Sequence, residues 1–184
     1  MNRPSRIFTI GHSTLAADAF LPMLSAHRVE LLADVRRFPA SRRHPQFNRD
    51  ALAELLAGKG IAYLHFPELG GRREPKPGSP NTAWREAGFR GYADYMETAE
   101  FNQGIARLLH ATQAGATAIM CAEKSWRSCH RGLIADHLKA LGIEVIHILD
   151  AAATEPHPWT AAARMIDGRL SYAVAGIDQQ QLPF

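Results

Sequence analysis

Short apolar runs rich in β-branched residues alternate along this chain with longer segments of helical periodicity. The apolar runs cover residues 7–10, 31–35, 61–66, 116–120 and 144–148. Such alternation is typical of a parallel sheet covered by helices, because consecutive parallel strands need a crossover between them. The pattern predicts a single three-layer α/β domain over residues 1–184. Its central sheet should be mainly parallel, with about five strands and helices on both faces.

Helical periodicity fills the intervals between these runs, and its segments cover residues 16–27, 48–57, 92–98, 101–112 and 129–141. Asn48 and Ser128 are suitable N-caps for the second and the last of these helices. The pattern weakens after residue 150, where we expect a short helix over residues 159–166. Beyond residue 168 we expect either an edge strand or a loosely packed tail.

The composition is that of a globular protein. Hydrophobic residues make up 46% and charged residues 21% of the chain, which argues against disorder. No apolar run reaches the roughly 18 residues that a membrane span needs. The first apolar run follows the N-terminus without a signal peptide, so we expect a cytoplasmic protein. Its two cysteines, Cys121 and Cys129, are too few for a disulfide framework and are core residues, metal ligands or reactive thiols.

Positive charge is concentrated after the second apolar run. No acidic residue interrupts the five arginines between residues 34 and 50, which are Arg36, Arg37, Arg42, Arg43 and Arg49. A local positive potential of this kind attracts phosphate groups. Alternatively, these arginines lie scattered on a solvated loop and bind no ligand. We expect an anionic, phosphate-bearing ligand or a nucleic acid as partner.

Polar segments follow three of the predicted strands, at residues 11–13, 34–37 and 121–124. In an open parallel sheet, ligands bind beyond the carboxyl ends of the strands. We therefore expect these segments to converge on one site. The candidate ligand-binding residues are Gly11, Ser13, Asp34, Arg36, Arg37, Arg42 and Arg131.

Cys129 is the strongest single candidate for catalysis. If Ser128 caps the last helix, Cys129 lies in its first turn, where free amide groups and the helix dipole stabilise a thiolate. Cys129 is then a nucleophile or a redox centre, with His130 or His12 carrying protons and Glu123 as general acid or base. The alternative is a half-buried structural cysteine.

Two further hypotheses concern the same segment. Cys121 and Arg127 have the Cys-x5-Arg spacing of cysteine-dependent phosphatases, although Glu123 would repel a phosphate and no glycine relieves the loop. Suitable metal ligands are present among Cys121, Glu123, Cys129, His130 and His12. Adjacent residues of a helix project about 100° apart, however, and paired Cys-x2-Cys spacing is absent. We therefore expect neither a metal nor a cofactor.

The chain resembles the bacterial and archaeal family known as domain of unknown function 488. The residues that carry the resemblance are 9–13, 32–39, 41–42, 47–48, 63, 69–71, 120–123, 129–131 and 168–170. The resemblance implies a compact α/β domain and identifies no substrate. It favours seven residues as site residues, which are His12, Asp34, Arg36, Glu123, Cys129, His130 and Arg131. It disfavours the phosphatase hypothesis, because Arg127 is outside the family pattern and Glu123 is within it.

The first functional hypothesis is an enzyme, a hydrolase or transferase acting on a phosphate-bearing small molecule, nucleotide or nucleic acid. The loop at residues 69–71 would close over the ligand. The second hypothesis is a non-catalytic binding module for nucleotides or nucleic acid. Its arginine-rich loop would contact phosphates, while Phe38, Tyr63, Trp84 or Trp126 would stack on bases.

Overall fold

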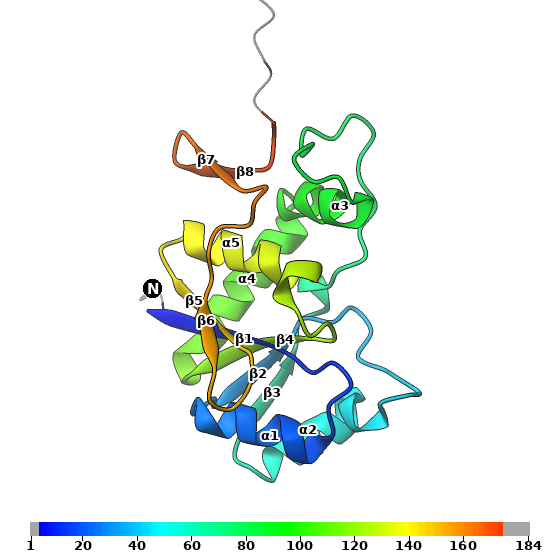
Figure 1. Ribbon diagram of the computed structural model, residues 1–184, viewed down its shortest axis with the longest axis vertical. Helices are drawn as coiled ribbons and strands as arrows, with labels where there is room; N and C mark the ends of the chain where they lie inside the picture. Colours follow the sequence, from blue (N-terminus) through cyan, green and yellow to red (C-terminus); the bar gives the residue numbers. More distant parts are fainter. Residues whose placement is uncertain (1–3, 175–184) are drawn as a thin grey trace, which may run out of the picture.

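The computed structural model describes residues 4–174, which form a six-stranded sheet with helices on both faces (Figure 1). The strand order is β3-β2-β4-β1-β5-β6. The parallel strands are β1 (Arg6–Gly11), β2 (Leu31–Asp34), β3 (Ala62–His65), β4 (Thr117–Cys121) and β5 (Glu144–Ile148). The edge strand β6 (Thr154–Pro156) runs antiparallel to β5. The expected three-layer α/β fold is confirmed.

Two groups of helices cover the sheet, one on each face (Figure 1). One group contains α1 (Ala17–Ala26) and α2 (Arg49–Ala57), and the other α3 (Ala87–Met96), α4 (Ala99–Ala111) and α5 (Arg131–Ala140). Successive strand residues point to opposite faces, so the strands divide their side chains between two cores. In β2, Leu32 packs into the α1–α2 core and Ala33 into the other.

The central strands β2 and β4 are buried at every position. Their apolar residues therefore read as continuous runs and do not alternate with polar residues, as expected for strands covered on both faces. Among the described residues, no helix is both long and apolar enough to cross a membrane.

Helix starts and caps differ from the prediction. Helix α3 begins at Ala87, five residues earlier than expected. Helix α5 begins at Arg131, two residues later than expected, because Trp126–Ser128 forms a separate 3-10 turn capped by Ser125. Asn48 is the N-cap residue of α2 as predicted, but its side chain accepts a hydrogen bond from the Ser41 amide at 2.6 Å and caps no helical amide.

The prediction for the C-terminal region was wrong in part. Residues 159–166 do not form a helix, and the segment ends in β7 (Arg164–Ile166). The strand expected beyond residue 168 exists as β8 (Arg169–Ser171), which pairs with β7 in a separate hairpin while β6 occupies the sheet edge. The last part of the predicted tail lies outside the described residues.

A buried polar network ties the C-terminal segment to the sheet and to α5. The His147 ring lies 2.7 Å from Thr9 Oγ1 and 2.9 Å from the His157 ring, which in turn lies 3.0 Å from Asp136 Oδ1. The hydroxyl of Tyr172 donates to Asp136 Oδ2 at 2.9 Å. Because each of these buried groups has a partner, the network fixes the packing of the segment.

Acidification should destabilise the fold. Burial lowers the pKa of His137 from 6.5 to about 4, and burial with the charge of His157 lowers that of His147 to about 2. The unfolded chain therefore binds protons first as the pH falls below 6.5, and the free energy of unfolding decreases. Each histidine contributes a slope of up to about 1.4 kcal/mol per pH unit. The free energy of unfolding, measured by urea denaturation between pH 6.5 and about 4, should decrease less steeply with falling pH in His137→Leu than in the wild type. An unchanged dependence on pH contradicts the prediction.

Candidate functional site

Three strand ends meet at one edge of the sheet, because β4 lies between β1 and β2. Gly11 pairs with Cys121 and Asp34 with Met120, so the polar segments that follow leave the sheet side by side. Backbone bonds continue past the strand ends, from the His12 amide to the Cys121 carbonyl at 3.0 Å, for example. The expected convergence at the carboxyl ends of the strands is present.

A cavity of about 580 Å³ opens at this edge. Its lining combines the strand-end segments with the start of α3 and the residues before α5. Of the residues expected at the site, those that line the cavity are His12, Ser13, Arg36, Arg37, Glu123, Cys129 and His130, and Cys121 lines it as well. Gly11, Asp34, Arg42 and Arg131 are not part of the lining.

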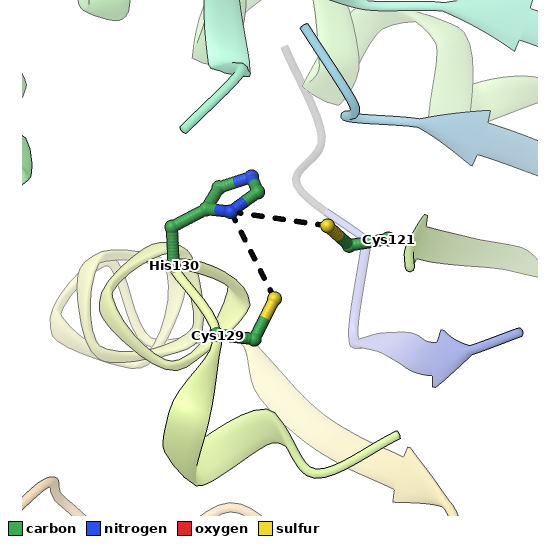
Figure 2. Close-up of side chains that lie close together, drawn as sticks. All are labelled: Cys121, Cys129 and His130. Atoms are coloured by element: carbon green, nitrogen blue, oxygen red, sulfur yellow. Dashed lines mark hydrogen bonds between the residues drawn. The ribbon is translucent and has the colours of Figure 1, made fainter. Parts of the chain in front are cut away.

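Cys121, Cys129 and His130 form a compact group, here called the Cys-Cys-His cluster (Figure 2). His130 Nδ1 lies 3.9 Å from the sulfur of Cys121 and 3.8 Å from that of Cys129. All three atoms lie within 4.8 Å of one another. Both cysteines are buried, at 4% and 3% exposure, while His130 is half-buried.

Backbone conformation brings the two adjacent members of the cluster together. Cys129 is extended, with φ −136° and ψ 143°, and His130 takes helical angles as the N-cap residue of α5. The two side chains therefore do not diverge as they would within a helix. The expectation that their adjacency prevents them from sharing one ion was wrong, because Cys129 precedes the helix.

The ring of His130 is held in a defined orientation. Its Nε2 lies 3.1 Å from the carbonyl oxygen of Val35. A carbonyl only accepts, so Nε2 carries a proton and donates it, and Nδ1 faces the two sulfurs. The ring also packs against Tyr92 at 5.1 Å.

Glu123 lies beside both sulfurs. Cys121 Sγ donates to Glu123 Oε2 at 2.9 Å, and Cys129 Sγ lies 3.3 Å from the same oxygen. The Glu123 side chain is exposed overall, so the cluster is buried on one side and meets the cavity on the other.

The surroundings of the two cysteines shift their pKa values in opposite directions. The hydrogen bond with Cys129 and burial raise the pKa of Cys121 well above its usual value. Burial raises the pKa of Cys129, but the hydrogen bond with Cys121, the contact with His130 and the charge of Arg131 together hold it well below its usual value. These shifts favour the thiolate at Cys129 and the thiol at Cys121.

Arg131 supports the sulfur of Cys129 from inside the protein. Its backbone amide and its Nε lie 3.5 and 3.4 Å from Cys129 Sγ. The other guanidinium nitrogens donate to Thr9 Oγ1 at 3.3 Å and to the Glu123 carbonyl at 2.6 Å. The side chain is 1% exposed, and within the described part of the chain no carboxylate forms a salt bridge with it. A buried cation is costly without an anion nearby, so the guanidinium favours the thiolate form of Cys129.

Arg36 is likewise occupied by protein partners. Asp34 accepts from its Nε at 2.9 Å and from its Nη2 at 2.6 Å, and Tyr63 donates to the same carboxylate at 2.7 Å. Arg36 Nη1 lies 3.2 Å from His12 Nε2. Arg36 and Arg131 were both expected to hold an anion, but their donors are directed at the protein, which favours positioning roles.

His12 is a neutral acceptor in this arrangement. Its Nδ1 lies 2.9 Å from the carbonyl of Ser13, so Nδ1 carries the proton and Nε2 accepts from Arg36. Burial and the Arg36 guanidinium lower the pKa of His12 to about 4. With both ring nitrogens engaged, His12 is less suited to carry protons than His130.

Arg37 and Arg72 provide exposed positive charge in the cavity lining. The Arg37 guanidinium donates to the Arg72 carbonyl at 3.2 Å, and both side chains are exposed. Sequence reasoning missed Arg72, His44, Phe89 and Tyr92 as cavity residues. The signal for Arg72 was its position directly after the Gly70-Gly71 motif in the long loop.

At two positions neighbouring atoms come too close to leave room for a side chain, so that glycine is required. A Cβ on Gly11 would lie 1.9 Å from the backbone oxygen of Glu123, so only glycine lets β1 pass beneath the Glu123 segment. A Cβ on Gly71 would lie 2.8 Å from His130 Nδ1. Gly71 therefore leaves room for the imidazole of the cluster.

Gly71→Ala should displace the His130 ring. The added methyl group meets a ring that is held by Val35 and Tyr92, and such overpacking costs about 1–3 kcal/mol. Gly88→Ala is the matched control, because Gly88 lines the same cavity and its Cβ would meet nothing within 4 Å. NMR spectra of histidine-labelled protein should show shifted His130 ring nitrogens only in Gly71→Ala. Unchanged His130 signals in that variant contradict the close approach.

Comparison with known proteins identifies the family of the chain. No curated protein and no solved structure matches it. One family model, described as a domain of unknown function, DUF488, matches residues 16–138, which is more than half of the chain. The matched range contains the cavity residues from Arg36 to His130. The chain therefore belongs to the DUF488 family.

Proposed function

We propose that this protein is an enzyme, a hydrolase or transferase, that acts on a phosphate-bearing small molecule, nucleotide or nucleic acid in the cavity. The observation that carries the proposal is the combination of two features in one cavity. Its buried end holds a cysteine sulfur whose pKa is lowered, an oriented imidazole and a carboxylate, and its exposed part holds two arginines.

The size and charge of the cavity support such a ligand. A volume of about 580 Å³ falls within the usual range for small-molecule sites. Asp34 neutralises Arg36, whereas the guanidinium groups of Arg37 and Arg72 have no carboxylate partner among the described residues. A guanidinium group can donate two parallel hydrogen bonds to two oxygens of one phosphate. Arg37 and Arg72 are therefore the proposed anion-binding residues.

The buried end supports chemistry at the ligand. Cys129, His130 and Glu123 lie close enough for a proton to pass between the sulfur, the ring and the carboxylate. Arg131 holds the Cys129 sulfur and, through the Glu123 carbonyl, the segment that carries the carboxylate. A ligand held by the exposed arginines would present its other end to this group.

A non-catalytic binding module is the second candidate, and one observation favours it. Phe38 is 66% exposed and lies beside the cavity arginine Arg37, whose guanidinium is 5.6 Å from the centre of the phenyl ring. An exposed aromatic ring next to a cation is a stacking platform for a nucleic-acid base. This candidate leaves the buried group of Cys129, His130 and Glu123 without a role.

Removing both cavity arginines should weaken ligand binding. The double variant Arg37→Ala/Arg72→Ala should lose roughly tenfold or more in affinity, because charge-assisted hydrogen bonds are worth about 1.5–3 kcal/mol each. The probes are fluorescent mononucleotides and a labelled single-stranded oligonucleotide, titrated at low and raised salt. Arg49→Ala is the control, since Arg49 is exposed and outside the cavity lining. Absence of binding to the wild type at low salt overturns the proposal.

Turnover separates the enzyme from the module. Wild-type protein should convert at least one bound probe or related phosphate ester, and Cys129→Ser should lower that rate by about a hundredfold or more. The same variant should retain probe affinity within about threefold, because the arginines are unchanged. Tight binding with no conversion of any compound would contradict the enzyme and favour the module.

A further inference from the structure

We infer that the Cys-Cys-His cluster binds one zinc ion, through Cys121 Sγ, Cys129 Sγ and His130 Nδ1, with a fourth coordination position open to the cavity. The inference deepens the proposed function, on which its catalytic role rests, because the ion supplies the reactive group at the buried end. Binding of the ion itself depends only on the three donors.

The spacing of the donor atoms suits a tetrahedral ion. Zinc lies about 2.3 Å from sulfur and 2.0–2.1 Å from nitrogen, which at tetrahedral angles separates the two donors by about 3.6 Å. The observed distances from His130 Nδ1 to the two sulfurs are 3.8 and 3.9 Å. A contraction of a few tenths of an ångström would therefore bring each nitrogen–sulfur distance to the tetrahedral value, and Figure 2 shows both sulfurs facing the same ring nitrogen.

The surroundings orient these donors as they do in metal sites. Metal-binding histidines commonly donate their second ring N–H to a backbone carbonyl, as His130 does to Val35. The sulfur of Cys129 receives two N–H groups from Arg131, which stabilise it as a thiolate. Cys121 is fixed at the end of β4, a fully buried strand. The donors are thus held in place by protein contacts before any ion binds.

Charge favours a divalent cation at this point. Two thiolates and the Glu123 carboxylate carry three negative charges, which the Arg131 guanidinium and a zinc ion together neutralise. Sulfur and imidazole donors select zinc over magnesium or calcium, which prefer oxygen. Without a cation, the carboxylate of Glu123 at 2.9 and 3.3 Å requires a proton on at least one sulfur. The ion would take the place of those protons.

An open fourth position gives the ion a chemical role. Three protein ligands with one free position are typical of catalytic zinc, whereas structural zinc has four. A water molecule in that position would face the cavity, and the ion lowers its pKa. The Glu123 carboxylate, which lies beside both sulfurs, would accept the proton of that water and leave a hydroxide as the nucleophile. Cys121 and Cys129 are then ligands and not nucleophiles.

Metal content tests the inference without any activity measurement. Untagged protein from zinc-supplemented cells should contain one zinc per chain by mass spectrometry. Cobalt substitution should give thiolate-to-cobalt charge-transfer bands and the intense visible bands of a tetrahedral site. His130→Gln and Cys121→Ser should each lower the zinc affinity, measured by competition with a chelating dye, by at least about a hundredfold. Removing a residue that only hydrogen-bonds to a metal ligand costs less than this. His44→Gln is the matched control, because His44 lines the same cavity outside the cluster.

Several results overturn the inference. Wild-type protein that is folded by circular dichroism, yet binds neither zinc nor cobalt stoichiometrically, contradicts it. A Cys121–Cys129 disulfide in the isolated protein, detected as missing free thiols, makes the cluster a redox pair. His130→Gln with wild-type affinity also contradicts it. The proposed function fails separately, when nucleotide probes neither bind nor react although zinc is present.

Discussion

Parallel pairing of β4 with both β1 and β2 is the constraint on which the site depends. The register places Cys121 opposite Gly11 and Met120 opposite Asp34. Each segment that leaves these strands is then held by backbone bonds to its neighbour, as Ser13 is to Ala122 and Val35 to Met120. A cavity wall made from three chain segments far apart in the sequence is thereby fixed by the sheet itself.

Arg131 links this edge to the core. Its guanidinium reaches from α5 across to Thr9 of β1 and to the carbonyl of Glu123, and its Nε faces the sulfur of Cys129. Burying a cation is costly unless an anion accompanies it. The group beside it here is a sulfur, so the guanidinium adds to the contacts with Cys121 and His130 that lower the pKa of Cys129. The same guanidinium thus positions the cluster and favours its thiolate form.

Much of the fold was predictable from local pattern. The strands were found because parallel strands buried on both faces are continuous apolar runs. The start of α5 was misplaced because Ser128 resembles an N-cap, whereas its hydroxyl donates to the Ser125 carbonyl at 3.3 Å. The β7–β8 hairpin was missed although Asp167-Gly168, both at positive φ, is a typical two-residue hairpin turn.

The site was predictable only in part. The polar segments after the predicted strands indicated that the site lies at the carboxyl edge of the sheet. Which groups most of its side chains contact depends on tertiary structure, however, and could not be predicted. Asp34 lies two residues from Arg36, so their ion pair could be expected from the sequence, whereas nothing local indicates that Val35 orients His130. The metal hypothesis was set aside on helical geometry, and the structure removes that objection because Cys129 is extended.

Convergence of two sulfurs and one imidazole on a single point is the central claim, and anomalous diffraction tests it most directly. Crystals of the untagged protein as isolated, measured on both sides of the zinc absorption edge, should show one peak per chain. That peak should lie about 2.3 Å from the sulfurs of Cys121 and Cys129 and about 2.0–2.1 Å from His130 Nδ1. A map with no peak, in which the sulfurs form a disulfide or point away from the ring, contradicts the account.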